Sequence, residues 1–203
     1  MQIVVKQLGK RFNREWVFRK LEYSFQSTQS YAIIGSNGSG KSTLLQVLGS
    51  ITSPSEGVVE YFTEATLVEP EKMHSHITIA APYTELIEEM TAREFLQFHF
   101  AFKQASIPVN DILAIVQLVH AADKQIRYFS SGMKQRIKLA QAIFSSSEIL
   151  LLDEPCTNLD EEGIKLYQLL IQDYCKNKLI IVSSNDVQEY AFCKHQIHIQ
   201  QYK

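Results

Sequence analysis

The stretch "IIGSNGSGKSTLL", residues 33–45, places a cluster of glycine and serine with one lysine between an apolar run and a helical pattern. Gly35–Ser42 matches the pattern GxxxxGK[ST], directly after a strand-like run and at the start of a helix-like run. Glycines let backbone N–H groups turn inward around an anion, a helix N-terminus adds partial positive charge, and Lys41 adds a full charge. The stretch therefore predicts a loop that binds phosphate groups.

The same pattern assigns roles to the individual loop residues. The hydroxyl of Ser42 is expected to hold Mg²⁺. The residues expected to bind the nucleotide are Gly35, Ser36, Asn37, Gly38, Ser39, Gly40, Lys41, Ser42 and Thr43.

Short apolar runs and helical patterns alternate along much of the chain. The runs "YAIIG" (31–35), "EILLLD" (148–153) and "KLIIVSS" (178–184) are typical of parallel strands that are buried on both faces. Between them lie segments such as "SGMKQRIKLAQAIF", whose apolar residues recur at helical spacing. This alternation predicts an α/β fold with a mostly parallel sheet.

Two other segments depart from that alternation. The start, "QIVVKQLGKRFNREWVFRKLEYSFQ", alternates in polarity and contains turn residues, which predicts an antiparallel β subdomain. From about residue 82 to 127 there is no strong strand signal, so we expect an inserted helical subdomain. The predicted organisation is one domain, 1–203, with a core of 1–81 and 128–203.

The segment 82–127 contains one clear helix start. Thr91 and Glu94 form a capping box at the beginning of "TAREFLQFHFAFK". Phe95, Phe98 and Phe102 then fall on one face of the helix, and we expect all three to be core residues.

Composition excludes several classes of protein. The 203 residues carry a formal net charge of only −2, which does not favour a nucleic-acid partner. The three cysteines have no CxxC spacing, which argues against a disulfide framework or a zinc site and favours a reducing cytoplasm. No apolar run approaches the length of a membrane span, and charge interrupts the N-terminus too early for a signal peptide, so we expect no direct membrane insertion.

Two carboxylates follow the second buried strand. Asp153 and Glu154 end the run "ILLLDE" at the carboxyl edge of the predicted sheet, where ligands bind in α/β folds. Phosphoryl transfer needs one carboxylate for metal and one for water. We therefore expect Asp153 to bind Mg²⁺ and Glu154 to act as the general base.

A third motif gives the chain a specific resemblance. The segment "FSSGMKQRIKLAQA", residues 129–142, lies about twenty residues before the acidic pair and resembles the signature LSGGQxQR of the ATP-binding-cassette (ABC) family. Taken alone, it could also be an ordinary N-capped helix. The matching residues are Ser130, Gly132, Gln135 and Arg136, whereas Phe129, Ser131 and Met133 depart from the commonest residues.

The resemblance extends over essentially the whole chain and implies a P-loop NTPase core. "TNLD", 157–160, resembles the family's D-loop, with Asp160 at its acidic position. "KRFNREWVF" resembles the segment whose aromatic residue stacks on adenine, which implies Phe12, or Trp16 as a second choice. A structural role for that aromatic residue is nearly as plausible.

The family also implies partners. Two nucleotide-binding domains, identical or different, dimerise head to tail with ATP between the phosphate loop of one and the signature of the other. The signature residues that would act in trans are Ser130, Ser131, Gly132 and Met133. A separate transmembrane permease subunit is implied as well, with the chain held peripherally on the cytoplasmic face of the cell membrane.

Two positions depart from the family. Pro82 stands near the place of the Q-loop glutamine, and Asn185 stands at the place of the switch histidine, where it becomes the candidate catalytic residue beside Glu154. His195 and His198 come too late in the chain to replace that histidine, and His198 is expected to be an ordinary strand residue. We therefore expect slow ATP hydrolysis.

The leading hypothesis is an ATP-binding and ATP-hydrolysing subunit of an ABC transporter that uses ATP and Mg²⁺. The alternative is a regulatory ABC module that closes on nucleotide with little or no hydrolysis, which the missing glutamine and histidine favour and Glu154 opposes. An ABC protein of DNA repair or translation is disfavoured, because the sequence lacks a coiled-coil arm, zinc cysteines, a second cassette and a basic run.

Overall fold

The computed structural model describes residues 1–64 and 66–203. They form two compact units. The first comprises Met1–Ile79, Glu148–Glu154 and Asn177–Lys203, and the second comprises Ala80–Ser147 and Pro155–Lys176. No helix within these described residues is long and apolar enough to cross a lipid bilayer.

The first unit contains an antiparallel sheet with the strand order β2-β1-β4-β5. Its strands are β1 (Gln2–Phe12), β2 (Glu15–Phe25), β4 (Glu56–Thr63) and β5 (Thr66–Val68). The expected antiparallel pairing of the N-terminal segment is confirmed by the register of β1 on β2, in which Ile3 lies opposite Phe25 and Phe12 opposite Glu15.

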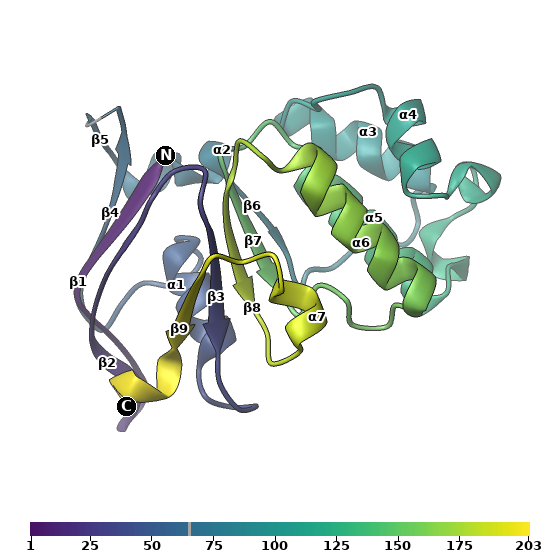
Figure 1. Cartoon of the computed structure of the whole chain (residues 1–203). Helices are drawn as coiled ribbons and strands as arrows, with labels where there is room; N and C mark the ends of the chain where they lie inside the picture. Colours follow the sequence, from purple (N-terminus) through teal and green to yellow (C-terminus); the bar gives the residue numbers. More distant parts are fainter. Residues whose placement is uncertain (65) are drawn as a thin grey trace. The chain divides into compact units, whose positions relative to one another are not determined.

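A second sheet has the order β6-β7-β8-β3-β9 (Figure 1). Its strands are β6 (Ile77–Ala80), β7 (Ile149–Asp153), β8 (Leu179–Ser183), β3 (Ser30–Ile34) and β9 (His195–His198). The pairs β7/β8, β3/β8 and β3/β9 are parallel, so the prediction of a mostly parallel sheet is confirmed. The carboxyl ends of β7, β8 and β3 therefore meet at one edge.

Helices and 3-10 turns complete the first unit. They are α1 (Lys41–Leu48), η1 (Pro70–Lys72), α2 (Met73–His76), α7 (Val187–Tyr190) and η4 (Ile199–Tyr202). Apolar side chains of both sheets and of α1 share one buried core, including Ile3, Ile33, Leu44, Leu151 and Ile181. This core fixes the strand that precedes the phosphate loop and the helix that follows it.

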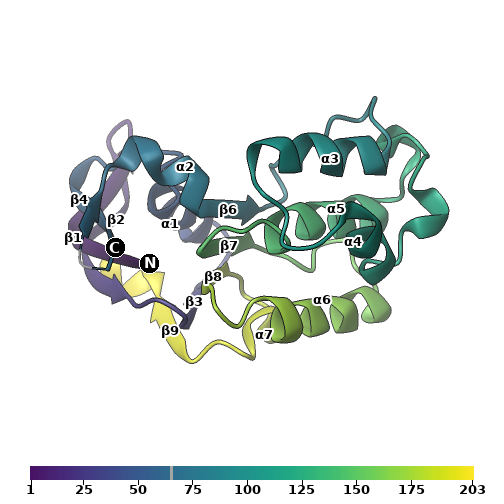
Figure 2. The same cartoon turned by 90° about the horizontal axis from the view of Figure 1, so that it is seen from above.

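The second unit is helical. Its elements are α3 (Ala92–Phe102), α4 (Val109–Ile115), η2 (Val119–Ala121), η3 (Ile126–Tyr128), α5 (Ser131–Ile143) and α6 (Glu161–Tyr174). Helix α5 lies between α3 and α6 and packs against both (Figure 2). The unit is larger than the segment 82–127, because α5 packs with α3, and α6 packs with α5, which brings 128–147 and 155–176 into it.

Helix α3 begins as expected but buries less of its apolar face. The Thr91 hydroxyl accepts from the backbone N–H of Glu94, and the Glu94 carboxylate accepts from the backbone N–H of Thr91. Phe95 is buried, whereas Phe98 is 45% exposed and Phe102 is 78% exposed. The expectation that all three are core residues is wrong, because the helices that pack on α3 cover only part of its apolar stripe.

Candidate functional site

The phosphate loop has a backbone that only glycine adopts easily. Gly38 and Gly40 have φ angles of +73° and +103°, in the left-handed region. A Cβ atom at Gly40 would lie 2.3 Å from the Cγ1 atom of Val17 on β2. Gly40 also forms the N-cap of α1, and its carbonyl accepts from the backbone N–H of Leu44 at 2.9 Å. The GxxxxGK[ST] spacing thus joins β3 to α1 through a tight turn.

Lys41 places a positive charge inside this turn. Its side chain is buried, and Nζ donates to the carbonyl oxygens of Gly35 and Ser36 at 3.0 and 3.3 Å. Within the described residues, no carboxylate forms an ion pair with it. A buried cation that is held only by neutral carbonyls favours an anionic ligand.

Three buried polar atoms, in the phosphate loop and at the carboxyl edge of the parallel sheet, have no hydrogen-bond partner in the described structure. They are Ser39 Oγ, Asp153 Oδ1 and Ser183 Oγ. Asp153 and Ser183 are register partners at the ends of β7 and β8. Buried polar groups are normally satisfied, so these atoms fit a ligand that supplies oxygen atoms together with a hard cation such as Mg²⁺. Ser183 was not among the expected site residues. The feature of the sequence that could have indicated it is its position as a small polar residue at the end of a buried strand.

The loops after β7 and β8 bring two further candidate residues to this edge. Glu154 has a φ angle of +44°, and its backbone N–H donates to the Ser183 carbonyl at 2.9 Å. Asn185 is exposed, and its Nδ2 donates to the side-chain Oδ1 of Asn37 in the phosphate loop at 3.0 Å. The expected residues of this group therefore gather in the first unit.

The two aromatic candidates on β1 and β2 differ in surroundings. Phe12 is 52% exposed, with the ammonium group of Lys10 5.1 Å from its ring centroid. Trp16 has the guanidinium groups of Arg19 and Arg11 at 4.4 and 5.6 Å from its ring. Arg19 is itself fixed by Glu56. Two guanidinium groups therefore lie over the ring of Trp16, whereas more of the Phe12 ring is open to solvent.

The signature residues form a separate group in the second unit. Ser130 is the N-cap of α5 and accepts from the backbone N–H of Met133 at 3.2 Å. Asp160 is the N-cap of α6 and accepts from the backbone N–H of Gly163 at 2.8 Å. Both N-caps line one cavity of about 350 Å³, together with Ser131, Gly132 and Met133.

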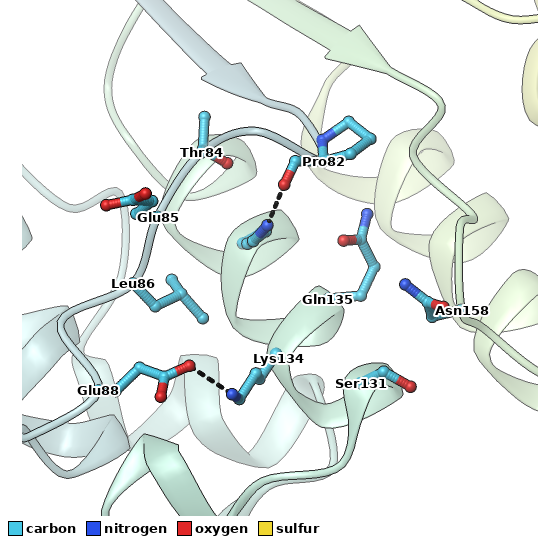
Figure 3. Close-up of a pocket in the computed structure, with 10 residues that line it drawn as sticks. Pro82, Thr84, Glu85, Leu86, Glu88, Ser131, Lys134, Gln135 and Asn158 are labelled. Carbon is cyan, nitrogen blue, oxygen red and sulfur yellow. Dashed lines mark hydrogen bonds and ion pairs between the residues drawn. The ribbon is translucent and has the colours of Figure 1, made fainter.

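A larger cavity of the same unit lies beside Pro82 (Figure 3). Its volume is about 470 Å³. Lys138 Nζ donates to the carbonyl oxygens of Pro82 and Ala81 at 2.9 and 3.3 Å, and Glu88 pairs with Lys134. Burial, followed by the charge of Lys134, lowers the pKa of Lys138. The other residues shown lining the cavity include Thr84, Glu85, Leu86, Ser131, Gln135 and Asn158.

Comparison with known proteins relates the chain to one family. The family model described as "ABC transporter" matches residues 18–157. The chain is 33% identical over 195 residues to the uncharacterized ABC transporter ATP-binding protein YybJ of Bacillus subtilis, covering 90% of this chain and 85% of that protein. It is 27% identical over 190 residues to the Nod factor export ATP-binding protein I of Burkholderia lata, covering 91% of this chain but only 62% of that protein.

A solved structure has the same fold. It is described as a dimeric, post-hydrolysis state of an ATP-binding cassette bound to ADP and Pi. The match has a TM-score of 0.81 at 21% identity and covers 97% of this chain and 94% of the other.

Proposed function

Because the chain belongs to the ABC transporter family, we propose that it is an ATP-hydrolysing subunit that binds Mg²⁺-ATP and drives a separate transmembrane permease. The observation that carries this proposal is the edge of the parallel sheet in the first unit. There, the buried Lys41 ammonium lies in the glycine loop that follows β3. Asp153 ends strand β7 of the same sheet, and its Oδ1 atom has no hydrogen-bond partner among the described residues. This combination suits a nucleoside triphosphate and its Mg²⁺ ion.

In this proposal, residues 35–43 hold the phosphate groups. The backbone N–H groups of the loop and the N-terminus of α1 face the anion, and Lys41 exchanges carbonyl acceptors for phosphate oxygens. Ser42 and Asp153 are the residues of this chain that would hold Mg²⁺. The ion would neutralise part of the phosphate charge.

Hydrolysis is assigned to Glu154 and Asn185. Glu154 is the proposed general base for water, and its left-handed backbone is held by the Ser183 carbonyl. Asn185 can donate a hydrogen bond to a phosphate oxygen but carries no charge, unlike a protonated histidine. Pro82 stands near the place where the family has a glutamine. The proposal is therefore that the isolated chain hydrolyses ATP slowly.

Phe12 is the proposed adenine platform. An aromatic ring stacks on any base through its π face, so the ring needs open surface. The 52% exposure of Phe12 supports this assignment. The two guanidinium groups beside Trp16 count against the second choice.

We also propose that a second nucleotide-binding domain, identical or different, completes the site. The amide groups at the start of α5 would bind the phosphate of the partner's nucleotide, and Ser130, Ser131, Gly132, Met133 and Asp160 would form that surface. Their common cavity of about 350 Å³ supports this grouping.

The permease contact is assigned to residues 81–90 of the second unit, on the cytoplasmic face of the membrane. The acidic residues Glu85, Glu88 and Glu89 in this segment suit a basic segment on the partner. Two of these are already paired within the chain, Glu88 with Lys134 and Glu89 with Arg127. Among the described residues, Glu85 is the one of these three carboxylates that forms no ion pair, so its charge is the most available to a partner.

The alternative is a nucleotide-gated regulatory module with little hydrolysis. Asn185 and Pro82 favour it, because each stands where the family uses a side chain that contributes to turnover. Glu154 favours the ATPase.

A steady-state ATPase assay on the purified chain, and on the chain with its co-purified membrane partner, tests the proposal. Turnover that needs Mg²⁺ and is lost in Glu154→Gln supports the ATPase. Tight Mg²⁺-ATP binding without turnover, in both the isolated and the assembled chain, would instead support the regulatory module.

A further inference from the structure

Strand β9 lies beside β3 and in parallel with it, so the two strands end together. Their last register pair joins Ile34 to His198. The phosphate loop follows β3 directly, and the 3-10 turn η4 (Ile199–Tyr202) follows β9 directly. Parallel register therefore brings the C-terminal turn alongside the first residues of the loop.

Two contacts join this turn to the loop. Ile199 is fully buried, and its Cγ2 atom is 3.0 Å from the position that a Cβ atom at Gly35 would occupy. Gln200 Nε2 donates to Ser36 Oγ at 3.0 Å. Ile199 anchors the turn in the core, and Gln200 extends from that anchor to the loop.

These contacts fall on the residues that hold the buried cation. Gly35 and Ser36 supply the two carbonyl oxygens that accept from Lys41 Nζ. A shift of Ser36 would therefore change the position of Lys41 as well as the path of the loop.

We propose that Gln200 is a positioning residue for nucleotide binding, which keeps Ser36 and the phosphate loop ordered before the nucleotide arrives. The inference rests on the proposed function. A loop that is already ordered loses less conformational entropy on binding, so preorganisation appears as affinity. A single side-chain hydrogen bond contributes modestly, so we expect Gln200→Ala to weaken Mg²⁺-ATP binding about 3- to 10-fold.

The first experiment compares Gln200→Ala with Gln201→Ala, a substitution of the exposed neighbour in the same turn. Calorimetry gives the dissociation constant for Mg²⁺-ATP, and thermal unfolding without nucleotide gives the stability. The expected result is a weaker affinity for Gln200→Ala only, with both melting temperatures close to that of the wild type. Equal affinity in Gln200→Ala and the wild type would overturn the proposal.

Hydrogen exchange separates this inference from the proposed function. Without nucleotide, peptides covering residues 35–41 should exchange faster in Gln200→Ala than in Gln201→Ala. If the wild type fails to bind ATP, the proposed function fails, and the exchange result still decides whether Gln200 orders the loop. Unchanged exchange in this region would refute the ordering role.

A double-mutant cycle tests whether Gln200 acts through Ser36. Gln200→Ala, Ser36→Ala and the double variant are compared for Mg²⁺-ATP affinity. Removal of either partner breaks the same hydrogen bond, so the double variant should lose less affinity than the sum of the two single losses. Strict additivity would show that Gln200 does not act through Ser36.

Discussion

Asn185 Nδ2 donates to Asn37 Oδ1 at 3.0 Å, so the loop after β8 is hydrogen-bonded to the middle of the phosphate loop although the two residues are 148 positions apart in sequence. Neither residue is buried. The contact places the Asn185 amide directly beside the loop that is proposed to hold the phosphates. When nucleotide binds, the amide can donate to a nucleotide oxygen instead of to Asn37.

The first prediction concerns turnover at Asn185. Asn185→His should raise the basal ATPase rate, because a charged imidazole can offset the charge of the transferring group. Asn185→Ala should lower the rate, by up to about 10²- to 10³-fold if the amide supplies a full transition-state contact. Steady-state kinetics with separately measured ATP affinity checks both. If both variants turn over ATP at the wild-type rate, Asn185 does not face the γ-phosphate.

Lys41→Ala should abolish ATP binding or nearly so. The substitution removes the full positive charge that lies buried inside the loop. Calorimetry with Mg²⁺-ATP measures the loss, and Lys124→Ala, which removes an exposed lysine of the second unit, is the control. An unchanged dissociation constant in Lys41→Ala would mean that the glycine loop is not the phosphate site.

Glu154→Gln should trap an ATP-bound dimer. The amide keeps the shape of the side chain but cannot take a proton from water, so the closed state forms without hydrolysis. Light scattering with and without Mg²⁺-ATP measures the mass, and Glu64→Gln is the control at an exposed position. A monomeric variant beside a normally active wild type would place the base elsewhere or make dimerisation dependent on the membrane subunit.

Phe12→Ala should weaken ATP binding by on the order of tenfold, since base stacking on an aromatic ring contributes about 1–3 kcal/mol. Affinity for inorganic triphosphate should not change, because that ligand has no base. Trp16→Ala is the matched comparison and should leave ATP affinity near the wild-type value. The opposite ranking of the two variants would assign the platform to Trp16.

The stability of the second unit should depend on pH through His99. Burial, followed by the charge of Lys103, lowers the pKa of His99 to about 4. The unfolded histidine has a pKa of about 6.5, so between these values the unfolded chain binds more protons, and the free energy of unfolding falls as the pH decreases from about 6.5 to about 4.

Urea unfolding at several pH values in this window checks that prediction. His99→Gln should reduce the pH dependence of the free energy of unfolding, whereas His120→Gln, at an exposed histidine, should preserve it. An identical pH dependence in His99→Gln and the wild type would contradict the assignment to His99.

Local patterns predicted much of the fold, including the strand, the tight turn and the helix of the phosphate loop. The glycines of the phosphate loop, the buried strands β3, β7 and β8 and the capping box of α3 are each specified by contiguous residues, because backbone conformation and capping depend on near neighbours. The same reasoning failed for Phe98 and Phe102, since helical spacing identifies an apolar face but does not say how much of it other helices cover.

The sequence by itself therefore determined the phosphate loop, the acidic pair at the end of a strand and the family to which they point. Only the tertiary structure decided that Ser183 lies beside Asp153, that Gln200 reaches Ser36 and that Glu88 is already paired with Lys134. These contacts join residues far apart in the chain, and they depend on the strand order β7-β8-β3-β9 and on helix packing within the second unit. Strand order and packing result from the burial of many apolar side chains together, so no single stretch of sequence specifies them.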